Sequence, residues 1–260
     1  MSAKPTRDRA AARARAQQLR EEQARAARRR ERWVRIGIAA AVLVAIVVVG
    51  VAVNANRTQV DTQAVLPAGV TEADGGLPLG SPDAPVTIDL WEDFQCPACA
   101  DFEATNAAVL DRAVADGDAL LVLHPLTFLD DSLGNSSSVP AAQALACTAD
   151  AGDEAALRFH ATVFANQPPE TRGQEAWSGD DLVRWAGESG ADEEDVRSCL
   201  DEERYAAWVD NVGRSGSSAG VTATPTMFVD GERVPDAQLG SMFDDPGVLE
   251  QVIADAVAAS

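Results

Sequence analysis

An uncharged run of eighteen residues, Ile36 to Val53, divides this chain into parts with different folding possibilities. At 1.5 Å per helical residue the run spans about 27 Å, close to the thickness of the hydrocarbon core of a bilayer. It lies between Arg35 and Arg57, and no clear Ala-x-Ala cleavage site follows it, which favours an uncleaved anchor over a signal peptide. We therefore predict a single transmembrane helix at 36–53, the alternative being a buried core helix.

Charge is distributed unevenly around this run. Residues 1–35 hold twelve of the 21 Lys and Arg residues but only four of the 41 Asp and Glu residues, so this arm carries about +8 and the remainder about −28. A basic arm before an apolar helix predicts a cytoplasmic N-terminus and an extracytoplasmic C-terminal part, in a single-pass protein of the cell membrane. The acidic remainder disfavours nucleic acid as a partner.

The rest of the chain reads as a linker at 54–85 and one α/β domain at 86–260. Val86, Ile88 and Leu90 alternate with more polar residues, which is typical of a strand. The predicted order is this strand, a Cys-x-x-Cys motif, a helix to about Ala115, a strand at 119–123, a helical block at about 139–218, a strand at 226–229, a hairpin turn at 230–231 and a final helix from about Asp244 to Ala259. This order indicates a thioredoxin-like fold with a helical insertion after its second strand.

All four cysteines, Cys96, Cys99, Cys147 and Cys199, follow the predicted anchor and should face an oxidising compartment. Four cysteines allow three pairings. Cys96 with Cys99 is the natural one, because a two-residue gap at a helix start suits a redox pair, and it leaves Cys147 with Cys199. We interpret the second pair as a structural disulfide, with a second redox relay as the alternative.

The segment Cys96-Pro97-Ala98-Cys99 has the composition of an exchangeable dithiol. Disulfide exchange needs a thiolate that attacks and a second thiol that resolves the mixed disulfide. The unpaired N–H groups and dipole at a helix start favour the thiolate of the first cysteine, so we assign Cys96 as nucleophile and Cys99 as resolving cysteine. Pro97 suits a first helical turn. A zinc site would need two further ligands at matching spacing, which do not appear, so no metal is predicted.

Other residues are placed near the dithiol by this topology. The loop that contains Thr224 and Pro225 should face the start of the helix, where a cis-proline would keep a backbone N–H away from the sulfurs. Glu92 and Asp93 precede the dithiol and are possible proton shuttles for Cys99, the alternative being solvated charges at a strand end. His124 and His160 are interpreted as structural.

The stretch from Trp91 to Cys99, together with Gly220 to Gly231, resembles the DsbA-like family of thioredoxin-fold proteins over about residues 77–258. The Phe159-His160 and Phe164–Gln167 patch resembles the helical insertion of that family. The resemblance is closest to membrane-anchored bacterial members in which an extra cysteine pair staples the helical domain. It implies that Cys96 and Cys99 are the redox pair and Pro225 the cis-proline. Ala98 departs from the best-known DsbA proteins, which carry a histidine at that place.

That family implies a dithiol oxidase that introduces disulfides into reduced or unfolded secreted proteins and is recharged by a quinone-linked membrane enzyme of the DsbB or VKOR-like type. The redox group is then the cysteine pair itself, with no cofactor. A reductase or isomerase, and a non-catalytic membrane-anchored chaperone or scaffold, are the alternatives. The absence of obvious heptad repeats favours a monomer.

Overall fold

The computed structural model describes residues 60–260, which form one compact unit. The basic arm predicted at 1–35 and the transmembrane helix predicted at 36–53 lie outside the described residues. Between residues 60 and 260, no helix has the length and apolarity required to cross a membrane.

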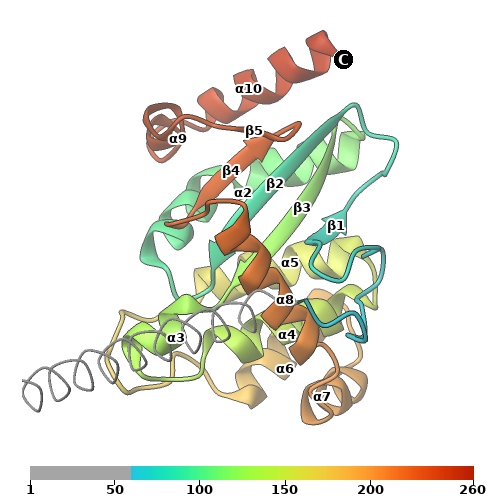
Figure 1. Ribbon diagram of the computed structural model, residues 1–260, viewed down its shortest axis with the longest axis vertical. Helices are drawn as coiled ribbons and strands as arrows, with labels where there is room; N and C mark the ends of the chain where they lie inside the picture. Colours follow the sequence, from blue (N-terminus) through green and yellow to red (C-terminus); the bar gives the residue numbers. More distant parts are fainter. Residues whose placement is uncertain (1–59) are drawn as a thin grey trace, which may run out of the picture. The chain divides into compact units, whose positions relative to one another are not determined.

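Five strands form a mixed sheet in the order β1-β3-β2-β4-β5 (Figure 1). The central strand β2 pairs in parallel with β3 and antiparallel with β4, and the outer strands β1 and β5 also pair antiparallel with their neighbours. The parallel pair is joined by helix α2, as a parallel connection requires a crossover. The strands are β1 (Leu77–Leu79), β2 (Val86–Asp93), β3 (Ala119–Leu126), β4 (Thr226–Val229) and β5 (Glu232–Arg233).

Alternation along β2 decides which side chains reach which face of the sheet. Trp91 faces helix α8 (Ala206–Ser218), where a Cβ added at Gly216 would lie 3.1 Å from the Trp91 ring. Glu92 points to the opposite face and bonds to a residue of α5 (Asp153–Ala165). Figure 1 shows α8 crossing in front of the sheet, with α2 (Pro97–Asp116) and α5 behind it. The strand thus sends neighbouring side chains into two separate helical layers.

The helical insertion contains more helices than the three or four segments that the sequence predicted. Five helices occupy the range from Ser138 to Ser218, and a short helix α3 precedes them. Ser178 caps α6 (Gly179–Ser189) and forms a capping box with Asp181. The other helices of this region are α3 (Phe128–Leu133), α4 (Ser138–Ala149) and α7 (Glu193–Asp201).

The linker predicted for residues 54–85 is corrected by the structure over most of its length. Leu77 and Leu79 are fully buried in β1, and the side chain of Asn211 in α8 bonds to both backbone groups of Asp61. The indole of Trp208 donates to the carbonyl of Gly75 at 2.9 Å. Such backbone-directed bonds leave no periodic signal in the sequence, and a three-residue strand is too short to show alternation.

Strand β3 also extends past its predicted end, through His124 and Pro125 to Leu126. β1 pairs only with residues 121–123 of β3, so the outer side of β3 is unpaired at Pro125, where a missing N–H costs no ladder bond. The predicted turn at Asp230-Gly231 and the final helix α10 (Pro246–Ala259) are confirmed, whereas α9 (Asp236–Met242) was not predicted.

The predicted pairing of Cys147 with Cys199 is confirmed. The disulfide joins α4 to α7 with the two Cα atoms 6.1 Å apart and 52 positions between them in the sequence. Closing a loop of this size in the unfolded chain corresponds to about 4 kcal/mol in the chain-entropy model.

We predict that the double variant C147A/C199A retains the fold and unfolds at a lower temperature. The lost constraint of about 4 kcal/mol corresponds to a decrease in Tm of roughly 8–16 °C for a domain of this size. Calorimetry of the full chain in detergent provides the measurement. The alkylation rate of Cys96 serves as the control, because a structural disulfide has no part in dithiol chemistry, and a folded variant with an unreactive Cys96 would contradict the structural role.

Candidate active site

Cys96 is the N-cap residue of α2, and Pro97 occupies the first helical position, as predicted. Pro97 forces a helical φ and lacks the N–H that would have no partner there, so the sequence itself places the helix start at the dithiol. The Cys96 side chain is nearly buried, and Cys99, one turn inside the helix, is fully buried. Both cysteines are free thiols in this structure.

The sulfur of Cys96 is held in surroundings that favour its anion. A hydrogen bond with the Cys99 thiol is the largest effect that lowers the Cys96 pKa, and burial opposes it. The nearby Thr224 side chain and the backbone of Cys99 and Ala98 act in the same direction as the Cys99 thiol, and the pKa is lowered to about 6. The backbone N–H groups at the start of α2 thus contribute as the sequence predicted, although Ala98 supplies no side-chain group.

The Thr224-Pro225 peptide bond is cis, and its loop lies against the dithiol, as predicted. The Cys96 thiol approaches the carbonyl oxygen of Thr224 at 3.5 Å. The Thr224 hydroxyl oxygen is buried and forms no full hydrogen bond within the described protein. This hydroxyl is therefore free to turn toward a Cys96 thiolate when one forms.

Cys99 has the opposite environment. Burial raises its pKa well above the ordinary thiol value, and both the hydrogen bond with Cys96 and the charge of Glu92 raise it further. Because the pKa of Cys96 is lowered and that of Cys99 is raised, Cys96 is the sulfur that attacks and that leaves as a thiolate. It also means that Cys99 exchanges a proton with another group whenever the disulfide closes or opens.

Glu92 lies beneath the dithiol and is almost completely buried. Burial raises its pKa well above the ordinary carboxyl value, and the nearby Cys96 raises it further. One carboxylate oxygen of Glu92 lies 2.9 Å from Nε2 of His160, and Nδ1 of His160 lies 3.5 Å from a carboxylate oxygen of Glu103 in α2. His160 and Glu103 are also buried, so the three side chains form a continuous buried chain.

Asp93, the second predicted shuttle, is occupied by structural bonds. Its carboxylate accepts from the backbone N–H of Gln95 and of Leu129 and from the Ser138 hydroxyl at 2.6 Å. Burial raises the pKa of Asp93 to about 6, against the lowering effect of these three bonds. Its geometry serves to fix the loop before Cys96 to α3 and α4.

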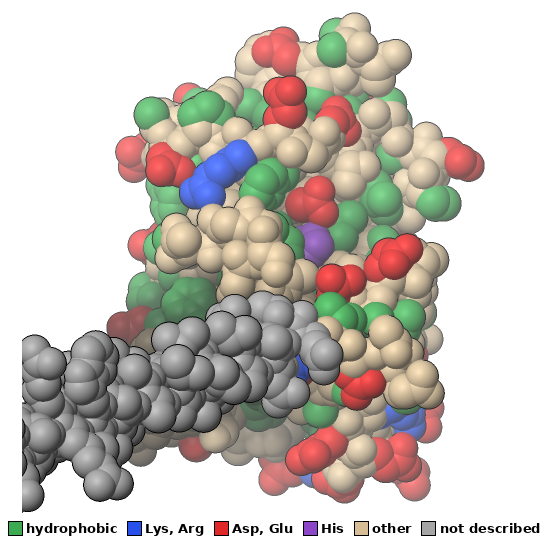
Figure 2. All heavy atoms as spheres, viewed as in Figure 1, with side chains coloured by type: hydrophobic (Ala, Val, Ile, Leu, Met, Phe, Trp, Pro, Cys, Tyr) green, Lys and Arg blue, Asp and Glu red, His purple; other side chains and the backbone are tan. Residues whose placement is uncertain are grey.

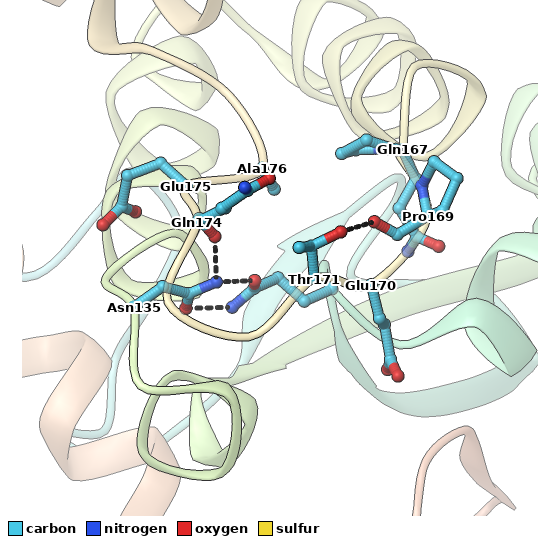
Figure 3. Close-up of a pocket in the computed structure, with 10 residues that line it drawn as sticks. Asn135, Gln167, Pro169, Glu170, Thr171, Gln174, Glu175 and Ala176 are labelled. Carbon is cyan, nitrogen blue, oxygen red and sulfur yellow. Dashed lines mark hydrogen bonds between the residues drawn. The ribbon is translucent and has the colours of Figure 1, made fainter.

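Amide side chains hold the same loop from the other side. Gln167 donates to the carbonyl oxygens of Phe94 and Cys96 at 2.7 and 3.0 Å. Gln95 and Asn135 exchange amide hydrogen bonds at the wall of a polar pocket beside the dithiol loop (Figure 3). The remaining wall of this pocket comes from the segment Pro168–Ala176.

Sequence reasoning missed Glu103, Gln95 and Gln167 as residues around the dithiol, whereas His160, interpreted as structural, is buried between Glu92 and Glu103. Glu103 follows Cys99 by four positions, so the two share a helix face, and this spacing was a usable signal. Gln95 and Gln167 carry no comparable signal, because their roles depend on how the helical insertion folds back over the dithiol loop.

The three buried groups also have the composition of a metal site. Within the described range, one ligand atom from each of Glu92, Glu103 and His160 lies within 4.8 Å of the other two. The two imidazole nitrogens, however, each face a different carboxylate. This arrangement fits a hydrogen-bonded chain, since ligands around a common ion would leave one nitrogen turned away from the site.

Comparison with known proteins agrees with this geometry. The family model described as Thioredoxin matches residues 72–244. The serine/threonine-protein kinase PknE of Mycobacterium tuberculosis is 31% identical over 185 residues, a match that covers 68% of this chain but only 31% of PknE. Disulfide bond formation protein D of Bacillus subtilis is 25% identical over 177 residues, which cover 67% of this chain and 75% of that protein.

Solved structures give the same result. Reduced DsbA from Mycobacterium tuberculosis has 25% sequence identity and a TM-score of 0.53, with 76% of this chain and 96% of that chain covered. MdbA, a thiol-disulfide oxidoreductase from Actinomyces oris, matches the fold with a TM-score of 0.61 and 23% identity, with 74% of this chain and 90% of that chain covered. The chain therefore belongs to the thioredoxin family and is similar to thiol-disulfide oxidoreductases of the DsbA type, with Cys96 and Cys99 as its candidate redox pair.

Proposed function

We propose that this protein is a dithiol oxidase that introduces disulfides into reduced secreted or cell-envelope proteins. The observation that carries this proposal is the depressed pKa of Cys96, to about 6, beside a Cys99 thiol whose pKa is raised. A stabilised Cys96 thiolate favours the reduced form of the protein, which makes its disulfide a stronger oxidant.

The reaction follows from the positions of the two sulfurs. A substrate thiolate attacks Cys96, the Cys96–Cys99 bond breaks, and Cys99 leaves with the electron pair and takes up a proton. The second substrate thiol loses its proton and attacks the substrate sulfur of the mixed disulfide. Cys96 then leaves as a thiolate, so the substrate loses two electrons and the protein gains them. Glu92, a buried carboxyl group whose charge raises the pKa of Cys99, exchanges the Cys99 proton.

Partners and location complete the proposal. Reoxidation requires an electron acceptor, for which a quinone-linked membrane oxidase of the DsbB or VKOR-like type fits the chemistry. We place the domain outside the cytoplasm, tethered by residues 36–53, because the run is apolar, the preceding arm is basic and all four cysteines follow it. The charged side chains on the face in Figure 2 are mainly Asp and Glu, with few Lys or Arg. Such a surface does not suit nucleic acid.

The central test is oxidative refolding of a reduced substrate protein by the full chain in detergent, paired with a redox titration of Cys96 and Cys99. We expect refolding to be accelerated and the reduction potential to lie well above about −270 mV, the value typical of thioredoxin. A potential near that of thioredoxin would instead support a reductase. The variant C96S should lose all exchange, and retention of full function by C96S would indicate a non-catalytic scaffold.

We predict that alkylation of Cys96 by iodoacetamide has a half-maximal rate near pH 6. The pKa of Cys96 is depressed, so the thiolate and the stability that it gives the reduced form are present above this pH and are lost as the pH falls through about 6. The variant T224V removes one hydroxyl that lowers this pKa and should move the midpoint upward by up to about one pH unit. A midpoint near pH 8.5 in the unmodified protein would contradict a stabilised thiolate.

The proposed topology is tested by single cysteines introduced at sites on either side of the predicted anchor. In intact cells, a membrane-impermeant maleimide should label D195C, on the exposed surface of α7, and should not label A3C in the basic arm. Labelling of A3C together with protection of D195C would reverse the proposed orientation. A background chain with all four native cysteines replaced by alanine controls for labelling of the native thiols.

A further inference from the structure

The buried chain of Glu92, His160 and Glu103 has more groups than a single proton acceptor requires. Three elements that are distant in sequence, β2, α5 and α2, each contribute one of its members. All three side chains are nearly inaccessible, with relative exposures of 4% for each. Burying three titratable groups together is costly unless they bond to one another. Their mutual contacts therefore indicate that the three groups act together.

The atoms of this chain are ordered for proton transfer. Nε2 of His160 lies 2.9 Å from Oε2 of Glu92, and Nδ1 lies 3.5 Å from Oε2 of Glu103. A neutral imidazole has one N–H donor and one acceptor nitrogen, so it can take a proton at one nitrogen while it releases another from the opposite one. His160 therefore connects the two carboxyl groups through a single ring.

The two ends of the chain are open. Oε1 of Glu92 and Oε1 of Glu103 are buried and have no hydrogen-bond partner within the described protein. Glu92 is close enough to Cys99 for its charge to raise the pKa of that thiol. The free oxygen of Glu92 thus has no partner that competes with Cys99, and the free oxygen of Glu103 ends the chain on the other side of the imidazole.

We propose that Glu103 is the terminal acceptor of the Cys99 proton, and that Glu92 and His160 relay the proton to it. This inference rests on the proposed function and names the group that completes its proton transfer. When Cys99 closes the disulfide, its sulfur bonds to Cys96 and the bond from Cys96 to the partner sulfur breaks, with the electron pair leaving on the partner. The Cys99 proton enters at Glu92, Glu92 gives its own proton to Nε2, and Nδ1 releases a proton to Glu103.

The relay gives Glu92 a route to pass a proton onward, since burial raises its pKa well above the ordinary carboxyl value and favours its protonated form. Burial raises the pKa of Glu103 to about 8, the charges of Glu92 and Asp111 raise it, and the proximity of His160 lowers it. These are the titratable groups that face Glu103 from β2, from its own helix α2 and from α5. Burial lowers the pKa of His160, so its ring is neutral at rest and able to relay.

The test is a stopped-flow measurement of the reduced full chain in detergent reacting with oxidised glutathione, in which closure by Cys99 is followed after formation of the mixed disulfide. The closure rate of the unmodified protein should rise with pH through a midpoint near 8, because ionised Glu103 is the better acceptor. The variant E103Q should lose this midpoint, and H160Q should close about ten-fold or more slowly at pH 7. In both variants the midpoint for Cys96 alkylation should not change.

The chain offers a matched control in its second histidine. His124 is also buried and also bonded to a carboxylate, Asp89, but it stacks on Trp91 on the opposite face of the sheet. The variant H124Q should therefore close at the unmodified rate. Equal slowing of H124Q and H160Q, or a shifted Cys96 alkylation midpoint in H160Q, would show a structural effect and overturn the relay.

The variant E92Q distinguishes a failure of the relay from a failure of the proposed function. If E92Q closes slowly while H160Q and E103Q close at the unmodified rate with an unchanged pH profile, Glu92 is the acceptor and the relay is refuted. If E92Q, H160Q and E103Q all close normally, both the relay and the role of Glu92 in the proposed function are refuted. E103Q gives the pH readout independently should H160Q fail to fold.

Discussion

The hydrogen bond between the thiols of Cys99 and Cys96 is the interaction on which the chemistry of this domain depends. It lowers the pKa of the Cys96 thiol and raises that of the Cys99 thiol, so two identical side chains differ in how readily they lose a proton. The bond exists because Pro97 starts α2 immediately after Cys96, which places the second thiol one turn inside the helix and in the core. A helix start displaced by one residue would change the orientation of both sulfurs.

Burial of Cys99 and Glu92 determines how the proton of the Cys99 thiol can be exchanged. Cys99 is fully buried and Glu92 is almost fully buried, so neighbouring protein groups are placed to exchange the proton. The sheet supplies the direction, because alternation along β2 turns Glu92 toward α2 and α5 while Trp91 turns toward α8. The fold therefore buries Glu92, His160 and Glu103 in the same layer as the resolving cysteine.

Much of this arrangement could be predicted from the sequence, and the limits have physical causes. The dithiol, the cis-proline loop and the second disulfide were predicted because each has a local motif or a countable partner. Strand β1 was missed because three residues show no period, and because its pairing with β3 and the bonds from α8 to the backbone before it leave no local signal. The contacts of His160 with Glu92 and Glu103 were not predicted, because these residues lie 68 and 57 positions away in the sequence.

The helical insertion holds the dithiol loop in position through hydrogen bonds. Ser138, at the start of α4, bonds to both Asp93 and Gln95, and the same helix carries Cys147 of the disulfide two turns further along. Gln167, just after α5, holds the carbonyl oxygens of the dithiol loop. The disulfide joins α4 to α7, and Ser138 at the other end of α4 holds the loop that ends at Cys96. The insertion therefore positions the dithiol loop through Ser138, while its disulfide stabilises the packing of α4 on α7.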